Sequence, residues 1–414
     1  MNKHFFETNR KNYLQKIENN SLSLFFSGRV YPKSADEDFE FEVNKNFYYL
    51  TGINQEKVVL ALVKREEPET ILFIEKNDPV LSKWVGRKLE KEEAAEISGV
   101  ADVRYLDEFE YFLYELFNAH RSYKKKPEVL YLDLKRRRDF TTQEILFARN
   151  FKKDYPDIAV KNAYDIVVGL RTIKSPEEIE LIKASIETTK GGLETMLKVA
   201  KPGMYEYQLE SYFDQYIKMN GQKTHAFKMI CASGKNAAIL HYVRNNTLMK
   251  EGDLVLFDLG TRTDFYVSDI SRTIPVSGKF PERARAVYRE VLEVNKKCID
   301  FVKPGVTWPE FNDYARGLLA EAAERLGLIK DRSEIRKYYW HSIGHFIGLD
   351  THDPGSYEIP FKPGMVLTVE PGLYIEEENI GVRIEDNVVV TEDGCVNLSA
   401  GIIKEIEDIE NFMK

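Results

Sequence analysis

Cysteine is scarce in this chain of 414 residues, which has only Cys231, Cys298 and Cys395, far apart in the sequence. An odd number of cysteines without close spacing predicts no disulfide framework and is typical of a reducing compartment. Long apolar runs are missing too, because no segment reaches the roughly 18 apolar residues that a membrane-spanning helix needs. The first residues also lack the apolar core of a signal peptide. We therefore expect a cytoplasmic protein with no membrane partner.

An excess of positive charge is absent as well. The chain has 59 lysine and arginine residues against 67 aspartate and glutamate residues, which gives a net charge of −8. Proteins that bind nucleic acid usually carry a clustered positive charge, so no nucleic-acid partner is expected. We interpret the basic runs at 123–128 and 135–139 as solvated faces rather than as a patch for polyanions.

Several familiar catalytic motifs do not occur in the sequence. It has no H-E-x-x-H zinc motif, no G-x-S-x-G nucleophile elbow, no G-x-x-x-x-G-K-[ST] phosphate loop and no G-x-G-x-x-G dinucleotide fingerprint. These absences disfavour zincins, α/β-hydrolases, P-loop enzymes and dinucleotide-dependent enzymes. Any chemistry has to come from another set of residues.

The length predicts two domains, residues 1–163 and 164–414. In the first, apolar spacing predicts a helix from about residue 3 to 19 and another within 105–120. Strands are predicted at four apolar segments, 22–28, 46–52, 58–63 and 70–74. The first domain is therefore expected to be a mixed α/β (α+β) domain.

The second domain is expected to begin just before a helix with a clear start signal. Ser175 is the predicted N-cap, Pro176 occupies the first helical position, and Glu178 completes a capping box. Ile182 and Ile186 then fall on one face of the predicted helix.

An internal repeat is visible in the second domain. The segment "KEGDLVLFDLG" (250–260) aligns without gaps on "KPGMVLTVEPG" (362–372), and the alignment places Asp258 on Glu370. Chance similarity between glycine turns followed by apolar strands is the alternative interpretation. The paired acids favour a duplication.

Each copy continues to a further acid in an apolar run, Asp269 in the first and Glu385 in the second. A weaker similarity relates 199–217 to 301–319, each with the pattern of a helix end, a turn and a new helix. Two copies would bring four strand acids together around a pseudo-twofold axis.

Four carboxylates in apolar strands are costly unless positive charge meets them. At an effective dielectric constant of about 20, two like charges 4 Å apart repel by about 4 kcal/mol. Two divalent cations would balance four negative charges, and carboxylate oxygens can bridge two metal ions. The acids therefore predict a dinuclear site of the kind that hydrolytic enzymes use.

Three of the seven histidines cluster in "HSIGHFIGLDTHD" (341–353), where two glycines disfavour a long helix. His345 is a candidate nitrogen ligand, His341 a candidate supporting residue, and His352 a candidate for proton transfer or substrate contact. Any single histidine is more often an ordinary core or surface residue. Their clustering favours a functional site.

Two further residues are candidates for the same site. His241 comes shortly before the first acid strand, although an exposed loop end would explain it equally well. Arg383 has the strand parity of Glu385, so we expect it to face the acids and orient one carboxylate through paired hydrogen bonds. A surface salt bridge is the alternative for Arg383. Asp264 has the opposite parity to Asp269, and we assign it to the turn between the two strands.

The segments that carry these residues resemble the pita-bread metallopeptidases, the group of methionine aminopeptidases, prolidases and aminopeptidase P. They are "FDLGTRTDFYVSDISRT", "GHFIGLDTHD", "LTVEPGLYI" and "GVRIEDNVVVT". The resemblance covers roughly residues 165–414 and implies a pseudo-symmetric pita-bread domain that binds two divalent metal ions. Manganese is usual in the aminopeptidase P branch, and cobalt, zinc or iron are alternatives.

The resemblance also implies a role for each matching residue. Asp258 would chelate one metal ion, Asp269 and Glu385 would bridge both ions, and His345 and Glu370 would bind the other. A bridging water would attack the peptide carbonyl, with Glu370 as proton acceptor. His241 and His352 would contact substrate or stabilise the tetrahedral intermediate. We also expect Arg383 to be a catalytic residue, and His341 and Tyr374 to contact substrate or support the ligands.

The N-terminal segments 39–63 and 83–95 resemble the N-terminal domain of aminopeptidase P, which methionine aminopeptidases lack. The resemblance implies a metallo-aminopeptidase that releases the first residue of peptides with proline second, and a homodimer or homotetramer. A dipeptide-specific prolidase is one alternative. A pita-bread protein that binds peptides or partners without catalysis is another, which the presence of all five ligand positions disfavours.

Overall fold

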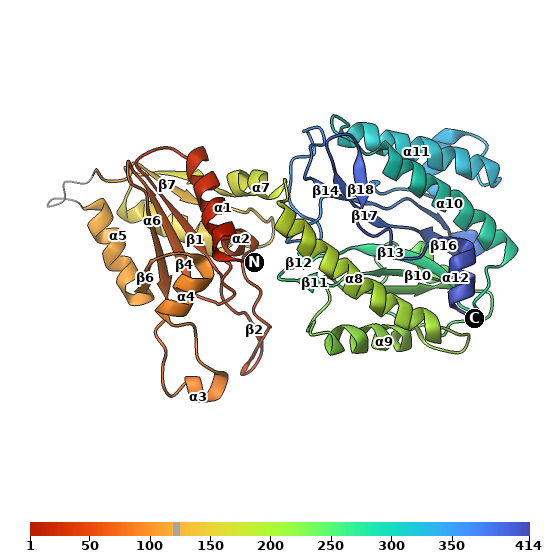
Figure 1. The fold of residues 1–414 in the computed structure, drawn as a ribbon, viewed down its shortest axis with the longest axis horizontal. Helices are drawn as coiled ribbons and strands as arrows, with labels where there is room; N and C mark the ends of the chain where they lie inside the picture. The colour runs from red at the N-terminus through yellow and green to blue at the C-terminus, as the bar shows by residue number, and fades with distance from the viewer. Residues whose placement is uncertain (119–124) are drawn as a thin grey trace. The chain divides into compact units, whose positions relative to one another are not determined.

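The computed structural model describes residues 1–118 and 125–414, which form two compact units, Met1–Arg171 and Thr172–Lys414 (Figure 1). The predicted ranges 1–163 and 164–414 differ from this division by one short helix, Tyr164–Arg171, which packs on the first two helices of the first unit. Two predicted features lie partly outside the described residues: the end of the helix expected within 105–120, and the start of the basic run at 123–128.

The first unit is built on a six-stranded mixed sheet with the strand order β6-β5-β4-β1-β7-β8. Its elements are α1 (Lys3–Lys16), β1 (Ser21–Phe26), β2 (Pro32–Ser34), β3 (Glu37–Asp38), α2 (Lys45–Thr51), β4 (Val59–Lys64), β5 (Glu69–Ile74), α3 (Ser82–Val85), α4 (Lys91–Ser98), β6 (Asp102–Tyr105), η1 (Leu106–Glu108), α5 (Phe109–Phe117), β7 (Val129–Leu132), α6 (Gln143–Asp154), β8 (Ala159–Asn162) and α7 (Tyr164–Arg171). β1 pairs antiparallel with β4 and parallel with β7. Aromatic residues of α5 and α6 join the core on one face of this sheet.

Most elements predicted in the first unit are confirmed, namely α1, β1, β4, β5 and α5. The strand predicted at 46–52 is wrong, because this segment forms α2. The side-chain oxygen of Asn44 accepts hydrogen bonds from the N–H groups of Asn46 and Phe47, and Gly52 ends the helix in the left-handed conformation with φ of 70°. The two caps outweigh the β-propensity of the aromatic residues.

The second unit holds helices in two pairs and several short sheets. Its elements are α8 (Pro176–Val199), α9 (Glu206–Met219), β9 (Ile230–Ser233), η2 (Gly234–Ala238), β10 (Leu254–Leu259), β11 (Arg262–Thr263), β12 (Tyr266–Val267), β13 (Ile270–Pro275), α10 (Glu282–Phe301), α11 (Trp308–Arg325), η3 (Arg332–Lys337), β14 (Val366–Val369), β15 (Gly372–Ile375), η4 (Glu376–Glu378), β16 (Ile380–Arg383), β17 (Asp386–Val390), β18 (Cys395–Asn397) and α12 (Ile406–Phe412). The capping box predicted at the start of α8 is confirmed.

The repeat seen in the sequence corresponds to repeated structure. Helix α8 packs on α9 as α10 packs on α11, and the antiparallel pair β10–β13 has a counterpart in β14–β17. Figure 1 shows these strands together in one unit with the four helices. The pseudo-symmetric second domain is therefore confirmed.

Asp264 lies in the turn between β11 and β12, as predicted. Asp264 and Phe265 both have positive φ, 45° and 69°, which is the geometry of a two-residue hairpin turn that follows the strand twist. Among the described residues, no helix is both long enough and apolar enough to cross a bilayer.

Candidate metal centre

The four predicted acids lie at the ends of two strand pairs. Asp258 is the fifth residue of β10, and Glu370 follows β14 directly. Asp269 and Glu385 immediately precede β13 and β17, and their residues are 5% and 2% exposed. The strands therefore carry the carboxylates into the interior on rigid backbone.

Hydrogen bonds between the two strand pairs hold the acids at one place. The Glu385 N–H donates to the Ser271 carbonyl at 3.0 Å. The Asn387 side chain accepts from the Asp269 N–H at 3.1 Å and donates to the Asp269 carbonyl at 2.7 Å. Each bridging acid predicted from the resemblance is thus fixed by a residue of the other strand pair.

The histidine segment 341–353 approaches β14 closely and forms no helix, as expected. A Cβ atom on Gly344 would lie 2.0 Å from the Thr368 carbonyl oxygen, so only glycine fits there. Next to it, the His345 N–H donates to Thr368 Oγ1 at 3.0 Å. This contact sets the position of the predicted nitrogen ligand.

The His345 ring is oriented toward the carboxylates. Its Nδ1–H donates to the Phe346 carbonyl at 2.9 Å, which leaves Nε2 without a proton in the neutral ring. Nε2 lies 3.4 Å from Asp269 Oδ2 and 3.6 Å from Glu370 Oε1. A lone pair on this nitrogen can therefore act as a metal ligand.

Arg383 faces the acid cluster, but the predicted paired hydrogen bonds to one carboxylate are wrong. Its Nη2 donates to Asp258 Oδ2 at 2.6 Å, while Nε donates to Ser271 Oγ at 2.7 Å and Nη1 to Tyr374 Oη at 3.2 Å. The guanidinium is divided among three partners because they surround it on different sides. Arg383 therefore orients Asp258 with one bond only.

His341 contacts the same network from the other side. Its Nδ1–H donates to the Ser342 carbonyl at 2.7 Å, and its Nε2 accepts from the Tyr374 hydroxyl at 2.9 Å. Burial and the charge of Arg383 lower the pKa of His341 to about 3, so the ring is neutral. The neutral ring supports the site, and its Nδ1 lies 3.7 Å from Glu370 Oε2.

All predicted site residues except Tyr374 line one cavity of about 360 Å³. Tyr374 lies behind it, in contact with Arg383 and His341. His241 and His352 are exposed residues that line the cavity, and the His352 ring meets the His345 ring edge-on with centroids 4.2 Å apart. The cavity thus has an acidic interior and imidazoles that solvent reaches.

Burial and mutual repulsion make the charged form of the carboxylates in this cavity unfavourable. The pKa values of Asp269 and Glu385 are raised well above their usual range by burial and by the neighbouring carboxylates, and burial also raises the pKa of Glu370. Among the residues that the structure describes, the one ion pair between a permanently charged group and the four acids joins Arg383 to Asp258. The cavity is therefore suited to cations, because their positive charge would offset the repulsion between the carboxylates.

The donor set fits divalent metal ions. Ligand atoms of Asp269, His345 and Glu385 lie within 4.8 Å of one another. Within the described ranges, Asp258 Oδ1 and Glu385 Oε1 are buried and accept no hydrogen bond. Carboxylate oxygens with one imidazole nitrogen suit manganese, iron, cobalt or zinc.

Sequence reasoning missed three residues of the site. Ser271 donates to Glu385 Oε2 at 2.8 Å, Thr368 donates to Glu370 Oε1 at 3.3 Å, and Tyr357 lines the cavity. Thr368 could have been found, because it lies two residues before Glu370 and so has the same strand parity. Ser271 has the same signal, because it lies two residues after Asp269, whereas Tyr357 has none.

The family model for metallopeptidase family M24 matches residues 180–392, and the model for the aminopeptidase P N-terminal domain matches residues 6–124. The chain belongs to metallopeptidase family M24. This membership confirms the predicted resemblance, the predicted pair of folds and the metal-dependent hydrolase class of the chain.

This M24 peptidase is similar over its whole length to curated and solved relatives. It is 33% identical to an Xaa-Pro aminopeptidase of Haemophilus influenzae, over 99% of this chain and 96% of the relative. A solved Bacillus anthracis structure assigned to aminopeptidase P is 44% identical, with a TM-score of 0.97 over 100% of this chain and 98% of that one. Aminopeptidase P from E. coli is 30% identical, with a TM-score of 0.92 over 100% and 98% of the two chains.

Proposed function

We propose that this M24 peptidase is an Xaa-Pro aminopeptidase, which releases the first residue from peptides with proline in second position. The observation that carries the proposal is a cavity lined by two buried and two half-buried carboxylates, one imidazole ligand and two exposed imidazoles. The chain also has the aminopeptidase P N-terminal domain. The full-length relatives named Xaa-Pro aminopeptidase support the same substrate class.

The five proposed ligands are Asp258, Asp269, His345, Glu370 and Glu385, and we propose that they hold two divalent ions, manganese in the cell. A solved structure of E. coli aminopeptidase P is zinc-substituted and in complex with product, which supports the binding of a divalent metal ion in this family. When bound, such cations lower the pKa of a water molecule and polarise the scissile carbonyl.

The side chains around the ligands have separate tasks in this proposal. Glu370, whose pKa is raised by burial, accepts the proton of the attacking water and delivers it to the leaving proline nitrogen. His241 and His352, exposed in the cavity, donate hydrogen bonds to the substrate carbonyl as negative charge develops on its oxygen. Arg383, His341 and Tyr374 keep Asp258 and Glu370 in position.

Substrate length separates the proposed activity from that of a prolidase. We expect hydrolysis of the first bond in Ala-Pro-Ala and in longer Xaa-Pro peptides, and little hydrolysis of Ala-Ala-Ala, measured by release of free alanine. Activity confined to the dipeptide Ala-Pro would contradict the proposal and favour the prolidase alternative.

Removal of one bridging acid tests the metal centre. Asp269→Ala should lose metal, measured by elemental analysis, and at least about 10³-fold in kcat, since such a ligand supplies several kcal/mol to the transition state. Asp264→Asn in the neighbouring turn is the matched control and should keep both. Undiminished hydrolysis by Asp269→Ala, or by the parent chain after thorough chelation, would show that the dinuclear mechanism is wrong.

We further propose a homodimer or homotetramer in the cytoplasm, as aminopeptidase P members usually form. Light scattering on the purified chain measures the molar mass. A mass of one chain at micromolar concentration would contradict the oligomer.

A further inference from the structure

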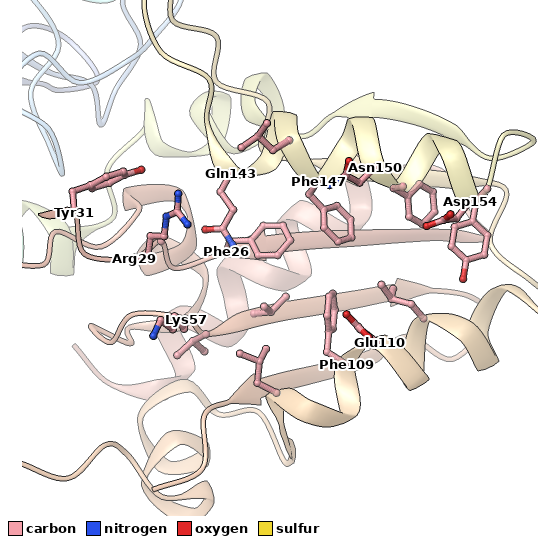
Figure 2. Close-up of a pocket in the computed structure, with 18 residues that line it drawn as sticks. Phe26, Arg29, Tyr31, Lys57, Phe109, Glu110, Gln143, Phe147, Asn150 and Asp154 are labelled. Atoms are coloured by element: carbon pink, nitrogen blue, oxygen red, sulfur yellow. The ribbon is translucent and has the colours of Figure 1, made fainter. Parts of the chain in front are cut away.

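A second cavity lies in the first unit, on the sheet face between α5 and α6 (Figure 2). Its volume is about 780 Å³, and all its lining residues belong to Met1–Arg171. Small-ligand sites have volumes of about 300 to 1,000 Å³. No residue of this cavity has a part in the proposed peptidase chemistry.

The floor of the cavity is a row of aromatic rings. Phe26 comes from the end of β1, Phe109 from α5, and Phe147 and Phe151 from α6. The Phe147 ring centroid lies 5.3 Å from that of Phe26, 6.3 Å from that of Phe109 and 6.0 Å from that of Phe151. These contacts hold the rings in a fixed surface that can receive apolar groups.

The two ends of the cavity carry opposite charge. Figure 2 shows Arg29, Tyr31 and Lys57 at one end, and Glu110 and Asp154 toward the other. The Arg29 guanidinium lies 5.9 Å from the Tyr31 ring centroid, and Lys57 Nζ is 3.6 Å from Glu75 Oε1.

Most of these charges are available to a ligand. Within the described part of the chain, no ion pair engages Arg29, Glu110 or Asp154, and all three residues are exposed. A ligand that fits must therefore offer a negative group at one end and a positive group at the other.

The length of the cavity sets the size of that ligand. Helix α6 runs along it from Gln143, near the cationic end, to Asp154 at the acidic end. At about 1.5 Å per residue this span is about 16 Å. An extended peptide covers about 3.3 to 3.6 Å per residue, so about five residues reach from one charged end to the other.

We propose that this cavity is a second peptide-binding site, which takes an apolar pentapeptide with both termini free. The peptide carboxylate lies at Arg29 and Lys57, its ammonium group at Glu110 and Asp154, and its side chains on the phenylalanine floor. A free peptide has the two opposite terminal charges that the cavity requires, at the required separation. The site binds without hydrolysis, and its existence does not depend on the proposed peptidase activity.

Calorimetry on the full chain with Leu-Leu-Phe-Leu-Leu tests the site, because this peptide lacks the proline of the proposed substrates. We expect saturable binding that weakens about tenfold or more in Arg29→Glu and in Asp154→Lys, since each removes a charge-assisted hydrogen bond. Lys153→Glu is the matched control, because this exposed residue of α6 lies outside the lining and should leave the affinity unchanged.

End-blocked peptides test the same contacts without a change in the protein. The peptide with a C-terminal amide should bind the parent chain about tenfold more weakly than the free peptide, and Arg29→Glu should not weaken its binding further. The N-acetyl peptide should likewise bind the parent chain more weakly, and Asp154→Lys should not weaken its binding further. The proposal is overturned if the parent chain shows no saturable binding at millimolar peptide. It is equally overturned if neither variant changes the affinity of the free peptide, as binding at the metal centre would give.

Discussion

At the scale of single residues, Arg383 decides how the acid cluster is organised. Its guanidinium is 2% exposed and contacts Asp258, Ser271 and Tyr374 at once. Ser271 in turn contacts an acid of the other strand pair, because its hydroxyl donates a hydrogen bond to Glu385. One arginine therefore fixes acids from both strand pairs.

Arg383→Lys should lower kcat by about tenfold to a hundredfold, because an ammonium group keeps the charge but cannot bond three partners around a plane. Steady-state kinetics and elemental analysis, measured together, separate lost positioning from lost metal. Arg283→Lys is a suitable control, since Arg283 pairs with Glu378 at the surface. Parent-like kcat in Arg383→Lys would show that charge alone suffices.

A buried carboxyl group in the first unit makes stability depend on pH. Burial, with a further contribution from the charge of Asp133, raises the pKa of Glu144 to about 7. An acid whose pKa is raised by folding favours the folded state when it is protonated. Its contribution is complete below pH of about 4.5, the unfolded value, and is lost as the pH rises to about 7.

Glu144→Gln should remove this loss, since the amide stays neutral. The free energy of unfolding of the variant, relative to the parent, should rise by up to about 3 kcal/mol between pH 4.5 and 8. Urea unfolding across this range, with the exposed Glu96→Gln as control, measures it. A constant difference between variant and parent would mean that Glu144 ionises as freely as in the unfolded chain.

At the scale of elements, the first residue of α9 holds the loop that carries His241. The Glu206 carboxylate is fully buried and accepts hydrogen bonds from five donors. They are the Ser233 N–H and hydroxyl, the Asn236 amide, the Tyr242 hydroxyl and the Thr247 N–H. These partners lie on both sides of His241 in the chain, so the helix end positions the loop.

Glu206→Gln should destabilise the protein by about 2 to 4 kcal/mol, because an amide group then faces donors that need an acceptor. We expect a higher KM with metal content unchanged, because the proposed role of His241 is to contact substrate and not to hold metal. Thermal unfolding and kinetics check both effects, with Glu180→Gln on the exposed side of α8 as control. A variant with parent-like stability and KM would contradict this role for the helix end.

At the scale of the whole molecule, the two units carry different sites. All five proposed metal ligands lie in Thr172–Lys414, and the aromatic cavity lies in Met1–Arg171. Loss of the cations exposes the buried carboxylates to their mutual repulsion. The effect on stability should therefore be confined to the second unit.

Removal of metal should lower Tm by several degrees, since a ligand at 100 times its Kd contributes about 2.7 kcal/mol. Hydrogen exchange should accelerate in β10, β13, β14 and β17 and stay unchanged in β1 and β4. Asp269→Ala, treated with the same chelator, should show no further change. Equal acceleration in both units would contradict the assignment of the metal to the second.

The candidate site was predictable from the sequence to the extent that its signals are local. The acids recur at matching places in two copies of one strand motif, and strand parity relates Arg383 to Glu385 over two residues. The capping box of Ser175 and Glu178 and the turn at Asp264 are equally local. Such features depend on backbone geometry within a few residues, which the residue types themselves dictate.

The sequence by itself thus determined the acids, their strands, the clustered histidines and the two kinds of domain. Only the tertiary structure decided that Arg383 bonds Asp258, that Ser271 bonds Glu385 114 residues away, and that Asn387 fixes Asp269. The aromatic cavity between α5 and α6 also arises only in the tertiary structure. These contacts join segments far apart in the chain, so no local pattern encodes them, and they arise from the packing of whole strands and helices.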